Sequence, residues 1–322
     1  MAKIKELTNI RKEMESIESE ISKIVVGQKQ IIHEILRAVL CGGHVLVEGV
    51  PGVAKTLIVR AISKILGCDM KRIQFTVDLL PTDITGIMSY TPKKGFEMIQ
   101  GPVFANFILA DEINRSPPKT QSALLEAMQE RSVTISRKTY DLPKPFFVIA
   151  TENPVETSGV YSLPEAQIDR FLFKILVEYP EEQEEREILS KNITTKHFDD
   201  YDLKKVLSPS KIIDLQGQVK KVFASDAIRE YIVSIVKETR GGTFELAKYI
   251  SYGASPRASI ALFIAAKAEA LMAGRDHVVP EDVRGVAYSI LRHRIILNYE
   301  AESEGVTTDK IIKHILGRVN AP

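Results

Sequence analysis

Residues 44–56 read His44-Val45-Leu46-Val47-Glu48-Gly49-Val50-Pro51-Gly52-Val53-Ala54-Lys55-Thr56. A short apolar run leads into a glycine-containing loop, and a helical pattern starts at the lysine. A strand, such a loop and a helix in this order form a cradle for phosphate, because loop amides and the positive end of the helix face the same anion. The stretch therefore predicts a phosphate site in an α/β fold.

Two side chains of this stretch indicate how a nucleotide would be held. Lys55 would reach the β- and γ-phosphates, and the Thr56 hydroxyl would coordinate Mg²⁺. The usual pattern has glycine directly before the lysine, whereas this chain has Ala54. If φ were positive there, alanine would be strained by about 1–2 kcal/mol. We expect ATP and Mg²⁺ as cofactors. The predicted nucleotide-binding residues are Gly49, Val50, Pro51, Gly52, Val53, Ala54, Lys55, Thr56 and Leu57.

Further short apolar runs follow, separated by helical segments, at 73–77, 107–110, 146–150 and 171–177. Runs that are apolar on both faces are typical of strands in a buried parallel sheet, here of about five strands. Helices are predicted at 55–66 and 119–129, and two more precede the first strand at 4–24 and 29–40. The fold class is therefore α/β, a P-loop NTPase αβα sandwich.

Two hairpins and a helical region complete the expected architecture. Turn residues between short strands predict hairpins over 87–99 and 132–142. After Pro180 the pattern is helical to about Arg294, with no further strand expected. We therefore predict a nucleotide-binding αβα domain at 1–180 and a smaller all-α lid domain at 181–322.

Acidic and amide side chains end two of the later strands. Asp111 and Glu112 follow the strand at 107–110, where Asp111 can hold Mg²⁺ and Glu112 can polarise an attacking water. Alternatively, the pair could cap the next helix. Asn153 follows the strand at 146–150 and could orient that water, although asparagine before proline is also a common turn former.

Composition narrows the class of protein. The 322 residues carry 43 Lys plus Arg against 42 Asp plus Glu, so no global positive field attracts nucleic acid. Cys41 and Cys68 stand alone, which argues against a disulfide framework and a zinc site. The charged N-terminus lacks the apolar core of a secretory signal, and no apolar run is long enough to span a membrane. We expect a cytoplasmic protein with no membrane insertion.

Five motifs in order resemble the MoxR group of AAA+ ATPases. They are Gly-x-Pro-Gly-x-Ala-Lys-Thr, Leu-Ala-Asp-Glu-Ile-Asn-Arg, Ala-Thr-Glu-Asn-Pro, Leu-Pro-Glu-Ala-Gln-Ile-Asp-Arg-Phe and Ala-Ser-Pro-Arg-Ala. The resemblance runs from about Val25 to Arg294, and Ala54 fits the MoxR form of the phosphate loop. It implies ATP hydrolysis by a motor that remodels or matures protein complexes.

The resemblance also implies residue roles. Lys55 and Thr56 would be the Walker A residues, Asp111 and Glu112 the Walker B pair, and Asn153 sensor 1. Gln28 would contact the adenine end of the nucleotide. The hairpins would be the helix-2 insert and the pre-sensor-1 hairpin, and residues 209–223 a pre-sensor-2 insert.

The resemblance implies roles for two arginines, although the sequence around each of them also allows other roles. Arg170 would be the arginine finger offered to a neighbouring subunit, although a salt bridge with Asp169 is the plain alternative and Arg115 is a second candidate. Arg257 would be sensor 2 of the lid, acting on its own nucleotide or on a neighbour's. A cation at a helix start is unfavourable unless an anion is near, which favours phosphate contact.

The expected partners follow from the same resemblance. They are other copies of the chain in a ring, as a hexamer, and a protein client, for which a von Willebrand factor A domain protein is a candidate. A metal-chelatase motor subunit, a DNA translocase or helicase, and a small-molecule P-loop kinase are the rivals. Near-neutral charge and no appended DNA-binding module count against nucleic acid, and a small kinase would not need Arg170, Arg257 and a long lid.

Overall fold

A computed structural model describes residues 2–49, 55–93, 95–154, 159–191 and 197–322. The chain forms two compact units. The sheet unit comprises residues 15–171 and 175–214, and the helical unit comprises 1–14, 172–174 and 215–322. Within the described ranges, no helix is both long and apolar enough to cross a membrane.

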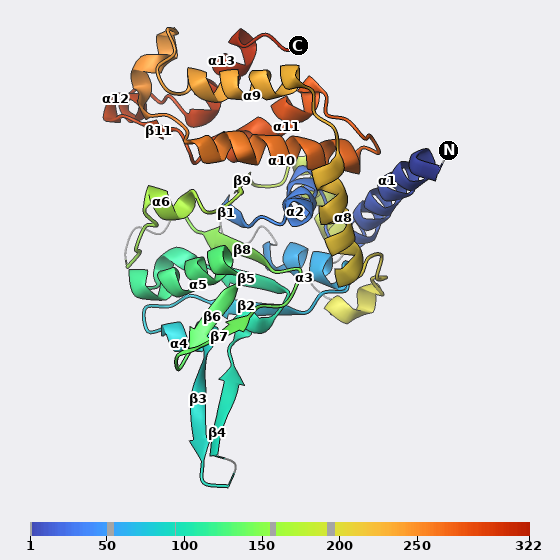
Figure 1. The fold of residues 1–322 in the computed structure, drawn as a ribbon, viewed down its shortest axis with the longest axis vertical. Helices are drawn as coiled ribbons and strands as arrows, with labels where there is room; N and C mark the ends of the chain where they lie inside the picture. Colours follow the sequence, from blue (N-terminus) through green and yellow to red (C-terminus); the bar gives the residue numbers. More distant parts are fainter. Residues whose placement is uncertain (1, 50–54, 94, 155–158, 192–196) are drawn as a thin grey trace. The chain divides into compact units, whose positions relative to one another are not determined.

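The sheet unit is built on the predicted five-stranded parallel sheet (Figure 1). This confirms the predicted fold class. In spatial order its strands are β2 (Met70–Gln74), β5 (Phe107–Asp111), β8 (Phe147–Glu152), β1 (Val45–Gly49) and β9 (Phe173–Val177).

Both faces of this sheet are buried, as its apolar strands require. On β5, Ile108 and Ala110 face a core shared with helix α5 (Pro118–Glu130). Their neighbours Phe107 and Leu109 point to the opposite face and are equally buried. Phe107 packs there against Phe147 of β8, with ring centroids 5.2 Å apart. The doubly covered sheet fixes the strand ends from which the candidate site is built.

Further helices lie wholly or partly in the sheet unit, and the part of α1 up to Met14 belongs to the helical unit. Helix α2 ends at Gly42, whose left-handed backbone (φ 66°) lets its N–H reach the carbonyls of Ala38 and Val39. Ile10 and Ile17 belong to the predicted apolar stripe of α1 and are buried. The helices are α1 (Ala2–Ile21), α2 (Lys29–Cys41), α3 (Lys55–Ile65), α4 (Pro81–Thr85), α6 (Glu165–Ile168) and α7 (Glu182–Lys191). Short 3-10 turns lie at η1 (Pro102–Phe104) and η2 (Ile113–Arg115).

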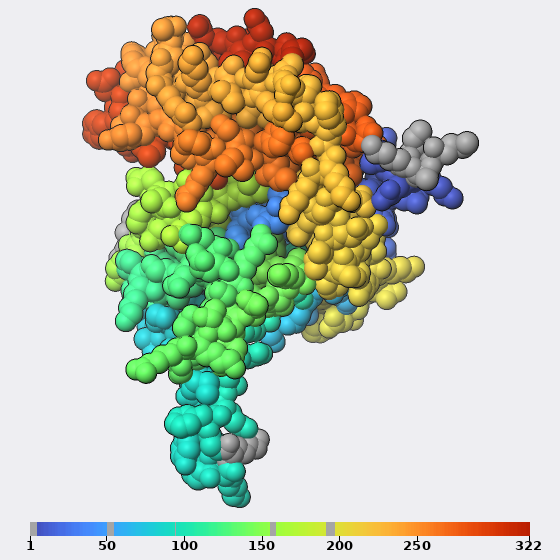
Figure 2. All heavy atoms as spheres, viewed as in Figure 1, coloured from blue at the N-terminus to red at the C-terminus, as the bar shows by residue number. Residues whose placement is uncertain are grey.

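Both predicted hairpins are present. Strands β3 (Gly86–Thr91) and β4 (Gly95–Gln100) pair antiparallel, as do β6 (Ser132–Ile135) and β7 (Lys138–Asp141). The β3–β4 hairpin projects away from the sheet, and its atoms stand clear of the rest of the unit (Figures 1 and 2).

The helical unit consists mainly of α9 to α13, with α10 packed against α9 and α11. The expectation of no further strand is wrong here. Strands β10 (Ile250–Tyr252) and β11 (Ile296–Leu297) pair antiparallel, and such short strands carry too little alternation to be detected in a sequence. The helices of this unit are α9 (Asp226–Glu238), α10 (Pro256–Met272), α11 (Pro280–Leu291), α12 (Tyr299–Ser303) and α13 (Thr308–Arg318), with the 3-10 turn η5 (Glu245–Tyr249). The 3-10 turn η4 (Phe198–Tyr201) lies in the sheet unit, and α8 (Pro209–Lys221) begins in the sheet unit and ends in the helical unit.

The compact units do not divide at residue 180. Beyond α7 the chain stays in the sheet unit, where the amides of Val206 and Leu207 donate to the Ile65 carbonyl at 2.8 and 3.2 Å. The Arg60 guanidinium lies 4.0 Å from the ring centre of Phe198. These contacts with α3 explain why the sheet unit continues to residue 214.

Candidate active site

Three strand ends meet at one edge of the sheet. β1 ends at Gly49, β5 at Asp111 and β8 at Glu152, and these three strands are direct neighbours. Parallel pairing sets Val47 opposite Thr151. The carboxyl ends of adjacent parallel strands form the crevice where open α/β sheets bind ligands.

Lys55 stands at this edge as the first residue of α3. Its ammonium donates a hydrogen bond to the Gly49 carbonyl. Burial lowers the pKa of Lys55, while the nearby charges of Asp111, Glu112 and Glu48 oppose that effect. The lysine therefore faces several carboxylates in a partly desolvated site.

Both carboxylate oxygens of Asp111 are engaged. The buried Thr151 hydroxyl donates to Oδ1 at 2.7 Å, and the Arg72 guanidinium donates to Oδ2 at 2.6 and 3.0 Å. These contacts come from β8 and β2, on either side of β5. Asp111 is thus fixed by both neighbouring strands.

Glu112 begins a turn with an unusual backbone. Its φ of 55° and ψ of 53° lie in the left-handed region, which costs a residue with a side chain about 1–2 kcal/mol. The Thr151 hydroxyl accepts the Glu112 N–H at 2.8 Å and so helps to hold this conformation. The Glu112 carboxylate accepts from Gln74 at 2.8 Å and from Arg115 at 3.0 Å. Strained residues of this kind concentrate at functional sites.

Sequence reasoning missed Arg72, Gln74 and Thr151. The strand predicted at 73–77 lies at 70–74, which puts Arg72 and Gln74 on β2 beside the acids. β2 is an edge strand with exposed Lys71 and Arg72, so its apolar run is interrupted. Thr151 stood in the quoted Ala-Thr-Glu-Asn-Pro motif, and its position directly before two polar residues was the available signal.

Only some of the other predicted nucleotide-binding and sensor residues lie in the described parts of the chain. Asn153 is buried just after β8, and Thr56 and Leu57 follow Lys55 in α3. Val50, Pro51, Gly52, Val53 and Ala54 lie outside the described residues.

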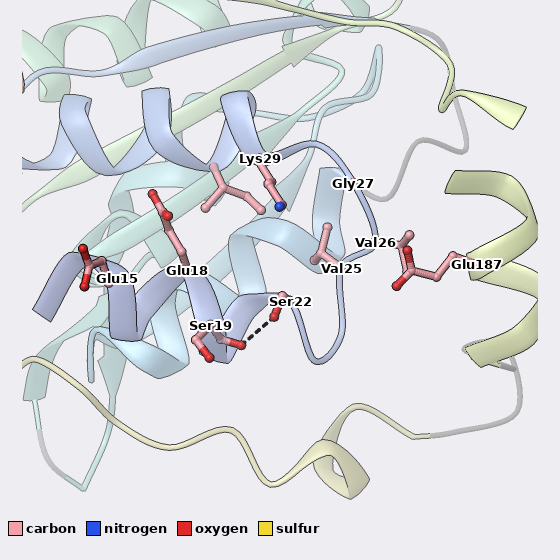
Figure 3. A pocket seen from close by; sticks show the side chains of 10 residues that line it. Glu15, Glu18, Ser19, Ser22, Val25, Val26, Gly27, Lys29 and Glu187 are labelled. Atoms are coloured by element: carbon pink, nitrogen blue, oxygen red, sulfur yellow. Dashed lines mark hydrogen bonds between the residues drawn. The ribbon is translucent and has the colours of Figure 1, made fainter. Parts of the chain in front are cut away.

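Gln28 is the N-cap residue of α2 and has a left-handed backbone (φ 52°). Beside it opens a pocket of about 460 Å³ between α1, α2 and α7 (Figure 3). Figure 3 shows Glu15 and Glu18 on α1, Lys29 at the start of α2, and Glu187 of α7 pointing toward Val26 of the loop between α1 and α2. The residues that line the pocket are Glu15, Glu18, Ser19, Ser22, Val25, Val26, Gly27, Lys29, Ile32 and Glu187.

The three arginines with predicted roles have different surroundings. Arg170 is exposed after α6 and donates to the Leu125 carbonyl at 3.2 Å. Arg115 donates to Glu112 of its own chain. Arg257 lies in the helical unit at the exposed start of α10, where Ser255 is the N-cap.

The donor set at the sheet edge fits a magnesium nucleotide. A lysine at a helix start suits phosphate, and the Asp111 carboxylate at a strand end and the Thr56 hydroxyl are oxygen ligands of the kind that Mg²⁺ takes. Across the described parts of the chain, no group of three or more His, Cys, Asp or Glu side chains could hold a metal ion by itself.

Relatives align with almost the whole chain. A protein named Chaperone MoxR1 from Mycobacterium tuberculosis is 46% identical, with 94% of this chain and 81% of the relative covered. A protein named Protein MoxR from Methylorubrum extorquens is 32% identical, covering 98% and 97%. The uncharacterized protein YeaC of Bacillus subtilis is 48% identical, covering 94% and 92%.

This chain belongs to the MoxR-type AAA+ ATPases. The sequence model of the ATPase family associated with various cellular activities (AAA) matches residues 44–173 of this MoxR-type protein, and that of the AAA lid domain matches 245–315. A crystal structure of a candidate ATPase from Cytophaga hutchinsonii superposes with a TM-score of 0.92 at 48% identity, covering 99% of this chain and 97% of that one. The MoxR-type chain is therefore an ATPase that binds nucleotide.

Proposed function

We propose that this MoxR-type ATPase hydrolyses ATP with Mg²⁺ and uses the energy to remodel or mature protein partners. The observation that carries the proposal is the network at the sheet edge, where Lys55 faces Asp111 and Glu112 and Thr151 joins the two acids. The chaperone name of one relative supports the kind of work proposed.

Each residue of the network has a proposed task. Lys55 holds the β- and γ-phosphates, while Thr56 and Asp111 hold Mg²⁺. The bound Mg²⁺ neutralises phosphate charge during transfer. Glu112 polarises the attacking water, and Asn153 orients that water. Gln28 and the residues from Gly49 to Leu57 surround the nucleotide.

Arg170 is proposed to act on the ATP of a neighbouring copy in a hexameric ring. An arginine supplied in trans stabilises charge on the transferring phosphoryl group. Its exposure beside a pocket of about 390 Å³ along α5 supports this role. Arg257 is proposed as the lid's contact with nucleotide, within the same chain or across the interface.

The β3–β4 hairpin is proposed to contact a protein client. Tyr90 and Phe96 face each other on it with ring centroids 5.1 Å apart, and they are 61% and 74% exposed. Exposed apolar groups of this size suit a polypeptide better than the phosphate backbone of nucleic acid. A von Willebrand factor A domain protein is the proposed class of partner.

The test separates nucleotide binding from hydrolysis. Lys55→Ala removes the phosphate contact, so we expect it to lose ATP affinity. Glu112→Gln keeps the shape of the site and removes the base, so we expect it to bind ATP and to lose turnover by about 10²-fold or more. Binding is measured with a fluorescent ATP analogue and turnover by phosphate release, each with Mg²⁺ and with excess EDTA.

Two outcomes contradict the proposal. Equal turnover by the wild type and Glu112→Gln removes Glu112 from the chemistry, and undiminished turnover in EDTA removes Mg²⁺. The matched control is Glu230→Gln in α9 of the helical unit, an exposed carboxylate outside this network, which should keep wild-type binding and turnover.

A further inference from the structure

One buried side chain connects the turn that carries Glu112 to a segment far along the chain. Gln121 lies in α5 and is fully buried. Its side-chain nitrogen lies 3.2 Å from the Ile113 carbonyl, 3.0 Å from that of Ser116 and 2.9 Å from that of Tyr161. A primary amide has two N–H groups, so one of them is shared between two carbonyls.

The backbone of Tyr161 is held on both sides. Its carbonyl accepts from Gln121, and its N–H donates to the Asn114 carbonyl at 2.7 Å. Hydrogen bonds therefore connect the turn at 113–116 to the segment at 159–163, and the Gln121 amide is at the centre of this network.

These hydrogen bonds help to hold the strained backbone of Glu112 in place. Thr151 holds the Glu112 N–H at the strand side, and the Arg115 N–H donates to the Glu112 carbonyl at 2.9 Å within the turn. Gln121 holds the carbonyls of Ile113 and Ser116, which lie at the two ends of the rest of the turn. A left-handed residue persists only where its surroundings fix it in this way.

The same contact reaches the segment between two other proposed site residues. Along the chain, Tyr161 lies after Asn153 and before Arg170. The Gln121 amide thus connects the Glu112 turn to the stretch between the proposed sensor residue and the proposed finger.

We propose that Gln121 is a positioning residue for ATP hydrolysis, which fixes the Glu112 turn against the segment at 159–163. The inference rests on the proposed role of Glu112. Gln121 touches no reacting atom and acts through the backbone of the turn. If instead it only satisfied buried carbonyls, its loss would lower stability without a specific effect on turnover.

The experiment compares two conservative variants on the same helix. Gln121→Met keeps the length of the side chain and removes its donors. Thr120→Val is the matched control, because the buried Thr120 hydroxyl donates to the Leu79 carbonyl at 2.7 Å, away from the turn. Both variants are studied well below their melting temperatures, so that the chains stay folded.

We expect Gln121→Met to lower kcat by about 10- to 100-fold, because small displacements of catalytic groups have effects of this size. The affinity for a fluorescent ATP analogue should stay within about twofold of wild type, since a contact made only in the transition state changes kcat alone. Hydrogen exchange should quicken together in 112–116 and 159–163. Thr120→Val should change neither kcat nor exchange in these two segments.

Several results would overturn the positioning role. They are a kcat for Gln121→Met equal to that of Thr120→Val, an equal loss of nucleotide affinity and turnover, or faster exchange in only one of the two segments. In the Glu112→Gln background, Gln121→Met should lower turnover no further, because the two residues act as a unit. If Glu112→Gln alone is fully active, the proposed role of Glu112 fails, whereas a slow Glu112→Gln with a fast Gln121→Met rejects only the positioning role.

Discussion

A buried histidine, His44, predicts that the stability of the sheet unit depends on pH. His44 lies directly before β1, where its Nδ1 accepts the Val148 N–H at 3.0 Å and its Nε2 contacts the Met128 carbonyl at 3.2 Å. Because Nδ1 must be an acceptor, Nε2 carries the proton and donates it. Burial holds the pKa of His44 at about 4, although the Met128 carbonyl favours the charged form.

The sign of the resulting pH dependence follows from linkage. Between about pH 6.5 and pH 4 the unfolded chain binds a proton at His44 that the folded chain does not bind, so stability falls as pH falls. From pH 7 to pH 5 the loss from this residue is about 2 kcal/mol. His44→Asn keeps an acceptor for Val148 and cannot titrate, so it should lose that share of the slope.

Urea unfolding at pH 7 and pH 5 measures this difference, with the exposed His277→Asn as control. A wild-type slope retained in His44→Asn would show that His44 is not the source.

At the scale of residues, the sequence indicated the candidate acids and lysine but not the residues that hydrogen-bond to the acids. Asp111, Glu112 and Lys55 could be proposed from the sequence because a phosphate loop and a strand ending in two acids are local patterns. Arg72 and Gln121 make contacts with residues 39 and 40 positions away. Such contacts depend on which strands become neighbours, and no local pattern encodes that order.

At the scale of elements, buried strands were predicted well and edge or very short strands poorly. β5 and β8 are covered on both faces, so their apolar runs mark them clearly. The predicted range of β2 was three residues too late in the sequence, because an edge strand tolerates exposed charges that interrupt its apolar run. The strands β10 and β11 were missed because they are too short. The hairpins were found from turn residues, yet only the structure shows which side chains share a face. Met88 and Met98 pack on the core beside the exposed Tyr90 and Phe96 pair.

The hairpin supplies a prediction about client contact. Tyr90→Ser with Phe96→Ser removes an exposed apolar pair, so stability and basal ATP turnover should stay near wild type. Stimulation of turnover by an unstructured protein such as casein should be lost. The control pair, Ile87→Ser with Ile99→Ser, lies on the opposite face of the same hairpin and should retain most of the stimulation.

Phosphate release with and without casein measures these effects, and duplex DNA provides a second arm. Full stimulation in the Tyr90 and Phe96 variant contradicts the client role of this face. Stimulation by DNA, lost when basic hairpin residues are neutralised, would instead favour a translocase.

At the scale of the whole molecule, the chain has a sheet unit and a helical unit, but their division lies elsewhere than predicted. Composition changes at Pro180, whereas compactness places residues up to 214 with the sheet. Residues 172–174 belong with the helical unit, because Arg294 donates to the Leu172 carbonyl at 3.1 Å and Arg292 to that of Lys174 at 2.9 Å. These contacts join residues that are far apart in the sequence, so the composition of the chain around Pro180 does not predict them.

The proposed motor function depends on active sites shared between copies of the chain. Arg170 would complete the site of a neighbour and would not be needed to bind ATP in its own chain. Arg170→Ala should therefore bind nucleotide nearly normally and hydrolyse it about 10³- to 10⁵-fold more slowly. Lys55→Ala should fail to bind nucleotide.

Mixing these two inactive variants tests the shared site most directly, with light scattering of the separate and mixed samples to establish that subunits exchange. We predict that the mixture regains part of the wild-type phosphate release, because an intact Lys55 from one chain meets an intact Arg170 from the other. Turnover that stays at the level of the separate variants after exchange, or full activity of Arg170→Ala alone, would contradict this account and make Arg115 the next candidate.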